Sequence, residues 1–194
     1  MLKRFSCPAL LLILIAIFLP AFSHAEEWKK PKGVAALKIG ILGKGKIHYN
    51  HNGVMDISKS SFSGGFVLVF PVYRRFYIGP SFDLYMAKEA RSQGRDEPIL
   101  DFAFNLKSKF KTGNRNIFLW PTFSIGYAFP KDKEEFEDVY GITLKLFCDF
   151  VYQASDKVGL LAEIGGAYSP YVHHPDYDNV TAGPLLTLRG GFLF

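Results

Sequence analysis

The chain has 194 residues, 23 Lys and Arg against 18 Asp and Glu, and a formal net charge of +5. This length is enough for a single domain, and the charge is too small and too dispersed to indicate phosphate binding, which argues against a nucleic-acid-binding protein. Aromatic residues make up 16% of the chain, including 19 Phe, and such a content is typical of proteins that place aromatic rings at a membrane surface.

The N-terminal segment is typical of an export signal. Two basic residues precede an apolar run over residues 9–22, and Ser23-His24-Ala25 matches a small-residue cleavage site. An uncleaved helical anchor is the alternative, but the run is shorter than the roughly 20 residues needed to span a bilayer, and Pro20 interrupts it. We expect residues 1–25 to be removed as a signal peptide, which leaves residues 26–194 as one domain.

Alternation of apolar and polar residues with a period of two recurs along this domain and predicts eight strands. We expect them at residues 33–43, 59–70, 76–86, 99–110, 117–129, 140–152, 158–169 and 183–194. Three connections are short, at 71–75, 111–116 and 153–157, and four are longer, at 44–58, 87–98, 130–139 and 170–182. Short periplasmic turns alternating with long external loops are typical of a transmembrane β-barrel.

Two prolines fall inside predicted strands, Pro80 and Pro121. Proline has no N–H to donate and a closed barrel has no free edge, so each proline predicts a bulge or a bend. A bulge at Pro121 would also turn Trp120, which parity alone places inside, toward the outside.

The two faces of the strands differ in composition. In the fourth strand, for example, Phe102 and Phe104 alternate with Asp101, Ala103 and Asn105. A water-facing exterior would carry many long charged side chains, whereas a narrow lumen has room mainly for small ones. The pattern therefore favours a lipid-facing apolar exterior and a polar lumen over a soluble barrel of the lipocalin type.

Charged residues on the predicted lumen face are balanced, with four of each sign: Lys38, Asp83, Asp101, Lys107, Lys145, Asp149, Glu163 and Arg189. An unpaired buried ion costs several kcal/mol, so we expect a salt-bridge network that fills the barrel. A proton or ion path, or an acid/base pair, is the functional alternative.

Charge also differs between the two ends of the predicted barrel. The rim with the short connections is basic, with Lys29, Lys30, Lys32, Arg74, Arg75, Lys109, Lys111, Arg115 and Lys157 against Glu26, Glu27 and Asp156, and the longer loops are net acidic. A basic rim can contact anionic phospholipid head groups, and acidic loops can hold divalent cations. Ordinary solvated connections would show the same composition.

The sequence predicts no catalytic, cofactor-binding or metal site. It contains neither a Gly-x-Ser-x-Gly elbow nor a phosphate-binding Gly-rich loop. The first and last loops would approach each other, but the spacing of their candidate ligands matches no defined metal site: His48, His51, His173, His174, Asp176 and Asp178.

The C-terminal strand carries the clearest signal. From Leu186 every second residue is apolar or glycine, up to Phe192 and the final Phe194, while Thr187 and Arg189 lie on the other face. With this strand and the export signal, the chain resembles the small outer membrane β-barrel proteins of Gram-negative bacteria, of the OmpA transmembrane-domain and OmpX type. The resemblance implies an outer membrane location and recognition of Phe192 and Phe194 by the barrel-assembly machinery.

The sequence thus predicts an all-β fold, a monomeric eight-stranded antiparallel up-and-down transmembrane β-barrel surrounded by outer membrane lipids. We expect a structural or surface-interaction role, with a filled lumen and outer loops that bind an external ligand or a host surface. A lipid-modifying outer membrane enzyme and a small-solute pore are the alternatives. The enzyme would need His, Ser and an acid at the outer rim, and the pore would need an open lumen.

Overall fold

The computed structural model describes residues 33–43, 45–49, 53–57, 61–87, 97–130, 140–155, 157–174 and 177–194. Residues 1–25, predicted as the signal peptide, lie outside these ranges. Within them we find no helix with the length and apolar composition needed to cross a membrane.

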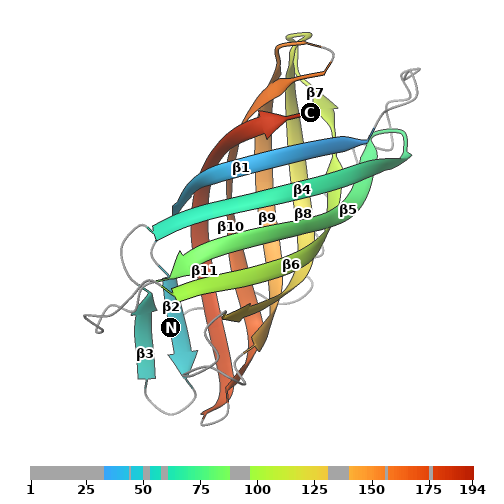
Figure 1. The fold of residues 1–194 in the computed structure, drawn as a ribbon. Coiled ribbons are helices and arrows are strands. Elements are labelled where there is room, and N and C mark those ends of the chain that lie inside the picture. Colours follow the sequence, from blue (N-terminus) through green and yellow to red (C-terminus); the bar gives the residue numbers. More distant parts are fainter. Residues whose placement is uncertain are drawn as a thin grey trace.

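Eight long strands form a closed antiparallel barrel (Figure 1). They are β1 (Val34–Leu42), β4 (Ser61–Tyr73), β5 (Phe76–Ala87), β6 (Glu97–Ser108), β8 (Ile117–Pro130), β9 (Tyr140–Gln153), β10 (Gly159–His174) and β11 (Tyr177–Leu193). Each pairs with the next along the chain, and β1 closes the ring by pairing with β11, from Ala36 opposite Leu193 to Leu42 opposite Thr187. The predicted fold class, an eight-stranded antiparallel up-and-down barrel, is confirmed.

The two ends of the barrel differ in how the strands are connected. The turn end has the short connections, at residues 74–75, 109–116 and 154–158, together with the two-residue strand β7 (Phe110–Lys111), which pairs with β8. The opposite end, called the loop end below, has the connections from β1 to β4, β5 to β6, β8 to β9 and β10 to β11.

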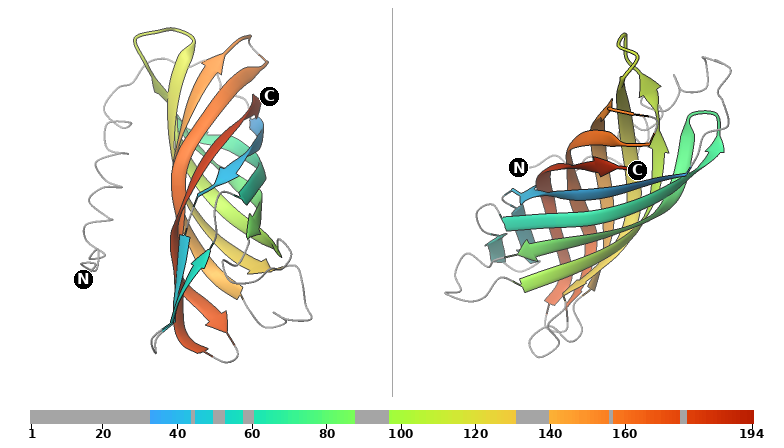
Figure 2. Two further views of the ribbon diagram at one scale, coloured as in Figure 1. Left: turned by 90° about the vertical axis from the view of Figure 1, so that its left-hand side faces the viewer. Right: turned by 45° about the horizontal axis from the view of Figure 1, so that its top comes forward.

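At the loop end the sheet continues beyond the ring, where the sequence predicted loops (Figure 2). A hairpin of β2 (Gly45–Tyr49) and β3 (Gly53–Ile57) occupies most of the predicted loop 44–58. It pairs with β11 through β2, where His48 lies opposite Thr181. The prediction of a loop at residues 170–182 is also wrong. β10 and β11 extend into this range, and the last pair places His174 opposite Tyr177.

Register shifts explain why alternation did not reveal this extension. Three irregularities follow Ala167 in the β10–β11 ladder, at Ala167/Ser169, Ser169/Val172 and Val172/His174. Each extra residue moves the following side chains to the other face. The backbone pairing therefore persists while the pattern with a period of two is lost.

Of the bulge or bend predicted at each of the two prolines, the bulge is absent from the described ladders. Pro80 lies opposite Phe104 of β6, and Pro121 lies opposite Cys148 of β9, both without a register shift. On the other side of β8, the pairing with β6 ends where Lys107 lies opposite Thr122. It resumes in the same register with β7, where Phe110 lies opposite Leu119, and Pro121 lies in the gap between them. The ladder thus skips the position where proline offers no N–H, and Trp120 stays inside the barrel, where it is 2% exposed.

The two faces of the wall have opposite chemistry. Lys38 is 5% exposed, whereas its neighbours Leu37 and Ile39 are 55% and 61% exposed. The same contrast holds around the ring, and the outward apolar side chains include Ile41, Phe66, Phe70, Phe102, Phe104, Ile125, Ile142, Phe150, Leu160, Ile164, Leu186 and Leu188. A soluble barrel of the lipocalin type has the reverse arrangement, and a contiguous apolar surface of this extent marks a membrane-contacting surface.

Candidate functional site

All eight charged residues that the sequence places on the lumen face are buried in the structure. Their exposure ranges from 0% for Asp101 and Glu163 to 5% for Lys38. They come from six strands, β1, β5, β6, β9, β10 and β11. The remaining two barrel strands, β4 and β8, contribute a glycine each. Gly65 lies opposite Asp83 in the ladder, and Gly126 lies opposite Ala103.

The eight side chains form one continuous chain of ion pairs in which the sign of the charge alternates. In order they are Lys107, Asp149, Lys38, Glu163, Arg189, Asp83, Lys145 and Asp101. Lys107 stands near the end of β6 that adjoins the turn end, and Asp101 stands near the opposite end of the same strand. The chain of charges therefore runs lengthwise through the lumen.

At the turn-end half of this chain, Lys107 Nζ lies 2.5 Å from Asp149 Oδ2. The other carboxylate oxygen, Asp149 Oδ1, is 3.6 Å from Lys38 Nζ, and Lys38 Nζ donates a hydrogen bond to Glu163 Oε2. Asp149 and Lys38 therefore each bridge two ions of opposite charge.

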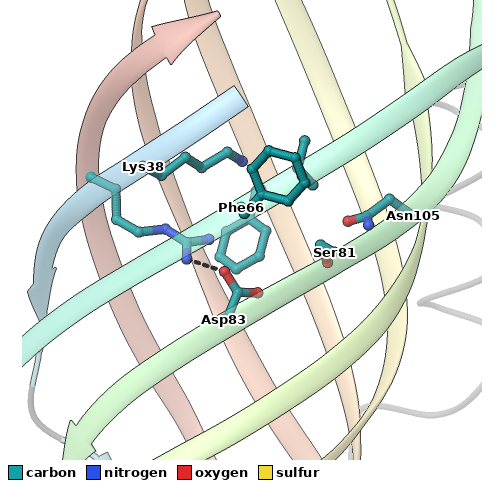
Figure 3. A pocket seen from close by; sticks show the side chains of 8 residues that line it. Lys38, Phe66, Ser81, Asp83 and Asn105 are labelled. Carbon is teal, nitrogen blue, oxygen red and sulfur yellow. Dashed lines mark hydrogen bonds and ion pairs between the residues drawn. The ribbon is translucent and has the colours of Figure 1, made fainter. Parts of the chain in front are cut away.

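In the loop-end half, Arg189 joins two carboxylates. Its Nη2 and Nε lie 2.5 Å and 2.6 Å from Glu163 Oε1, and its Nη1 donates to Asp83 Oδ1. Lys145 Nζ then lies 2.6 Å from Asp83 Oδ2 and 2.9 Å from Asp101 Oδ1. Figure 3 shows Lys38 and Asp83 pointing into the same space from β1 and β5.

The charges of this network balance one another. Four cations and four anions leave no net charge, and each ion has at least one opposite charge within 3 Å. Breaking a buried pair by removing one partner costs about 3–5 kcal/mol, because the remaining charge stays buried. The structure therefore makes the network the polar core of the barrel.

Glycines give the network its room. A Cβ built on Gly65 would overlap Asp83 Oδ1 and lie 3.1 Å from Arg189 Nη1. A Cβ on Gly126 would lie 2.6 Å from Asp101 Oδ1. Any larger residue at these two positions would have to displace a member of the network.

A small cavity remains beside the ion pairs. It measures about 10 Å³, and the residues that line it include Lys38, Ser81, Asp83, Asn105 and Arg189 (Figure 3). Such a volume holds about one water molecule when polar partners surround it. Asn105 is itself fixed, since its Nδ2 donates to Gly79 O at 3.0 Å and its Oδ1 accepts from Ser124 Oγ at 2.7 Å.

Between the network and the turn end, the lumen is filled by an apolar cluster, called the apolar lid below. Its buried members are Ala36, Val67, Val69, Tyr77, Phe118, Trp120, Val151 and Leu161. The rings of Tyr77 and Trp120 stack with centroids 5.2 Å apart. The Lys109 ammonium lies 4.0 Å from the Phe118 ring centroid, and burial lowers the pKa of Lys109 below its ordinary value.

Sequence reasoning missed the apolar lid because it equated the lumen face with polar residues. Parity would have located it. Trp120 has the same parity as Thr122, and Leu161 has the same parity as Glu163. The lumen is polar in its middle and apolar toward the turn end, so composition alone could not identify its full length.

The C-terminal residue takes part in closing the ring. Phe194 N donates to Ala35 O at 2.8 Å, and Ala35 N donates to Phe194 O at 3.1 Å. The side chains of Phe192 and Phe194 point outward, 51% and 58% exposed.

The histidines of the first and last loops form no recognisable site in the described part of the chain. His173 stacks on Tyr140, with ring centroids 4.7 Å apart. The side chains of His48, His51, His174, Asp176 and Asp178 lie outside the described residues. Among the residues described, no group of three or more His, Cys, Asp or Glu is placed to hold a metal ion.

Solved structures with similar architecture were found by comparison. The crystal structure of Neisserial surface protein A (NspA) matches with a TM-score of 0.58 and 15% identity, over 83% of this chain and 95% of NspA. Ail, the attachment invasion locus protein of Yersinia pestis, matches with a TM-score of 0.46 and 13% identity, over 84% and 100%. A de novo designed transmembrane β-barrel gives 0.42 and 12%, over 87% and 98%.

No protein-family model and no curated protein sequence matches the chain. At 15% identity the NspA match concerns the fold and not the activity. The closed ring of eight strands, its apolar exterior and the NspA match together show that this chain has the fold of the small outer membrane β-barrel proteins.

Proposed function

We propose that this protein is an integral, monomeric barrel of the bacterial outer membrane that presents a binding surface at its loop end. The observation that carries this proposal is the sheet that continues beyond the ring. β1 stops pairing with β11 at Leu42, opposite Thr187, whereas β11 continues for ten more residues, back to Tyr177. There it pairs with β10 and with the β2–β3 hairpin.

The membrane location is supported by the apolar exterior and by the NspA fold. In this proposal residues 1–25 act as a cleaved signal, and the barrel-assembly machinery reads the strand that ends in Phe192 and Phe194. NspA is by its name a surface protein, and we extend that general role to this chain.

A role in binding is favoured over transport by the contents of the lumen. The ion-pair network spans the middle of the barrel, and the apolar lid fills it toward the turn end. An eight-stranded barrel has an interior just wide enough for side chains to fill. The lumen therefore serves as a core that keeps the wall rigid.

In this proposal the loop end presents the binding residues, and the rigid wall holds them in place. The extended β10–β11 pair and the β2–β3 hairpin are held by backbone hydrogen bonds rather than by loop packing alone. An external ligand or host surface would thus meet an ordered sheet, which loses little conformational entropy on binding.

The test is adhesion of bacterial cells that display the barrel to cultured epithelial monolayers. Replacing residues 44–60 with a short turn, or shortening the β10–β11 pair by residues 170–182, should preserve membrane insertion and abolish adhesion. Replacing residues 112–116 at the turn end with a two-residue turn is the matched control and should leave adhesion unchanged.

Three results would overturn the proposal. Full adhesion by both shortened barrels would show that the loop end is not the binding surface. Release of fatty acid from lipid A by the purified protein would indicate a lipid-modifying enzyme. Sustained current through a planar bilayer would indicate a pore.

A further inference from the structure

The turn end carries a ring of exposed cations. Arg74 lies in the β4–β5 turn, Lys111 and Arg115 lie in the connection from β6 to β8, and Lys157 lies in the β9–β10 turn. All four are exposed, and they are called the cationic collar below. Because they come from three different turns, they are distributed around the barrel rather than along one strand.

The described residues of these three turns include no carboxylate side chain. Asp156, the one acidic residue of these connections, lies outside the described residues. Two further cations, Arg75 and Lys109, stand at the same end, closer to the mouth of the lumen. The described charged side chains at this end are therefore cationic, whereas the lumen network beneath them is neutral.

The apolar exterior reaches directly to the collar. Val72 and Tyr73 are 55% and 51% exposed immediately before Arg74, whose guanidinium lies 5.0 Å from the centroid of the Tyr73 ring. Val158, which directly follows Lys157, is 38% exposed, and Tyr152 near the turn-end terminus of β9 is 49% exposed. Tyrosine at the edge of an apolar belt marks the level of the lipid head groups, so the collar stands at the height of lipid phosphates.

We propose that the cationic collar binds the phosphate groups of anionic phospholipids in the leaflet at the turn end, which is the inner leaflet of the outer membrane. Phosphate groups at the head-group level carry the negative charge that such exposed cations attract. The interaction would fix the depth of the barrel and direct its loop end outward. This inference rests on the membrane insertion proposed above, and the experiment separates the two.

The expected size follows from the charge of the collar. A cation near an anionic membrane surface contributes about 1 kcal/mol, equal to about a fivefold change in association. Four cations that share several head groups should therefore give a clear preference for anionic over zwitterionic lipid. The preference should fall as added salt screens the charges.

The experiment uses the folded full barrel in phosphatidylcholine vesicles with traces of spin-labelled phosphatidylglycerol or spin-labelled phosphatidylcholine. Electron spin resonance gives the association of each labelled lipid with the protein. We expect the native barrel to prefer phosphatidylglycerol by about fivefold or more, and the variant R74Q/K111Q/R115Q/K157Q to lose that preference. Migration on gels without boiling shows independently whether each variant is folded and inserted.

The matched control is R74K/K111R/R115K/K157R, which keeps every charge and should keep the preference. A Gln variant that still prefers phosphatidylglycerol would assign the anionic lipid to another part of the barrel and overturn the proposal. Equal binding of both lipids by the native barrel would overturn it as well. A native barrel that fails to insert would instead contradict the proposed function.

Discussion

Removing Glu163 tests the lumen network most sharply, because this carboxylate is completely buried. It accepts hydrogen bonds from Arg189 Nε and from Lys38 Nζ. Glu163→Ala leaves both cations buried, with Lys38 depending on Asp149 at 3.6 Å and Arg189 depending on Asp83. We expect the free energy of unfolding to fall by about 3–5 kcal/mol, the usual cost of an uncompensated buried charge.

The assay is urea unfolding in lipid vesicles in a Trp28→Phe background, followed by the fluorescence of Trp120 in the apolar lid. At a urea dependence of about 2 kcal/mol per molar, the midpoint should fall by about 1.5–2.5 M. Glu135→Ala, in the predicted loop 130–139 and outside the described residues, serves as the control and should change stability by less than about 0.5 kcal/mol.

A double-mutant cycle with Lys38→Ala tests whether the loss of stability comes from the broken ion pairs. Removing Lys38 as well restores the balance of three cations and three anions, because Asp149 keeps Lys107 at 2.5 Å. The loss of unfolding free energy in the double variant should be smaller than the sum of the losses in the two single variants, by about 1–3 kcal/mol. Equal effects at Glu163 and Glu135, or strict additivity in the cycle, would refute the network.

Further outcomes follow from the same geometry. Gly65→Ala should destabilise the barrel in the urea assay because its Cβ would overlap Asp83 Oδ1, whereas Gly190→Ala on the outer face, where the nearest atom is Leu161 O at 3.9 Å, should be near neutral; equal losses would contradict the assigned faces. Deleting Phe194 should reduce the amount of heat-modifiable protein in the outer membrane fraction, since this residue pairs with Ala35 at the ring closure; unchanged assembly would contradict that role. Planar bilayers containing the native barrel should show no steady conductance, because the network and the apolar lid fill the lumen; sustained single-channel steps would show an open path.

The strands of the ring could be predicted because lipid outside and ions inside impose opposite chemistry on alternate residues. Lys38 between Leu37 and Ile39 is an example. The loop end could not be predicted in the same way, since the register shifts after Ala167 break the period while the backbone stays paired.

The sequence could also place the charged side chains in one lumen, but it could not order them. Which cation meets which anion depends on barrel closure. Arg189, for example, reaches Asp83 from β11 although 106 residues separate them in the chain. The balance of charge was visible in the sequence, and the path from Lys107 to Asp101 required the register of all eight strands.

Fluorescence quenching tests most directly whether the apolar wall faces lipid while Trp120 lies in the lumen. With Trp28→Phe, Trp120 is the single tryptophan. With Trp28→Phe and Trp120→Phe, the change Phe104→Trp supplies a single tryptophan at a position that is 56% exposed. Brominated acyl chains should quench the added tryptophan strongly and Trp120 weakly, and aqueous acrylamide should reach neither well. Strong acrylamide quenching at position 104, with no effect of brominated lipid, would show that the outer face meets water and would contradict the membrane barrel.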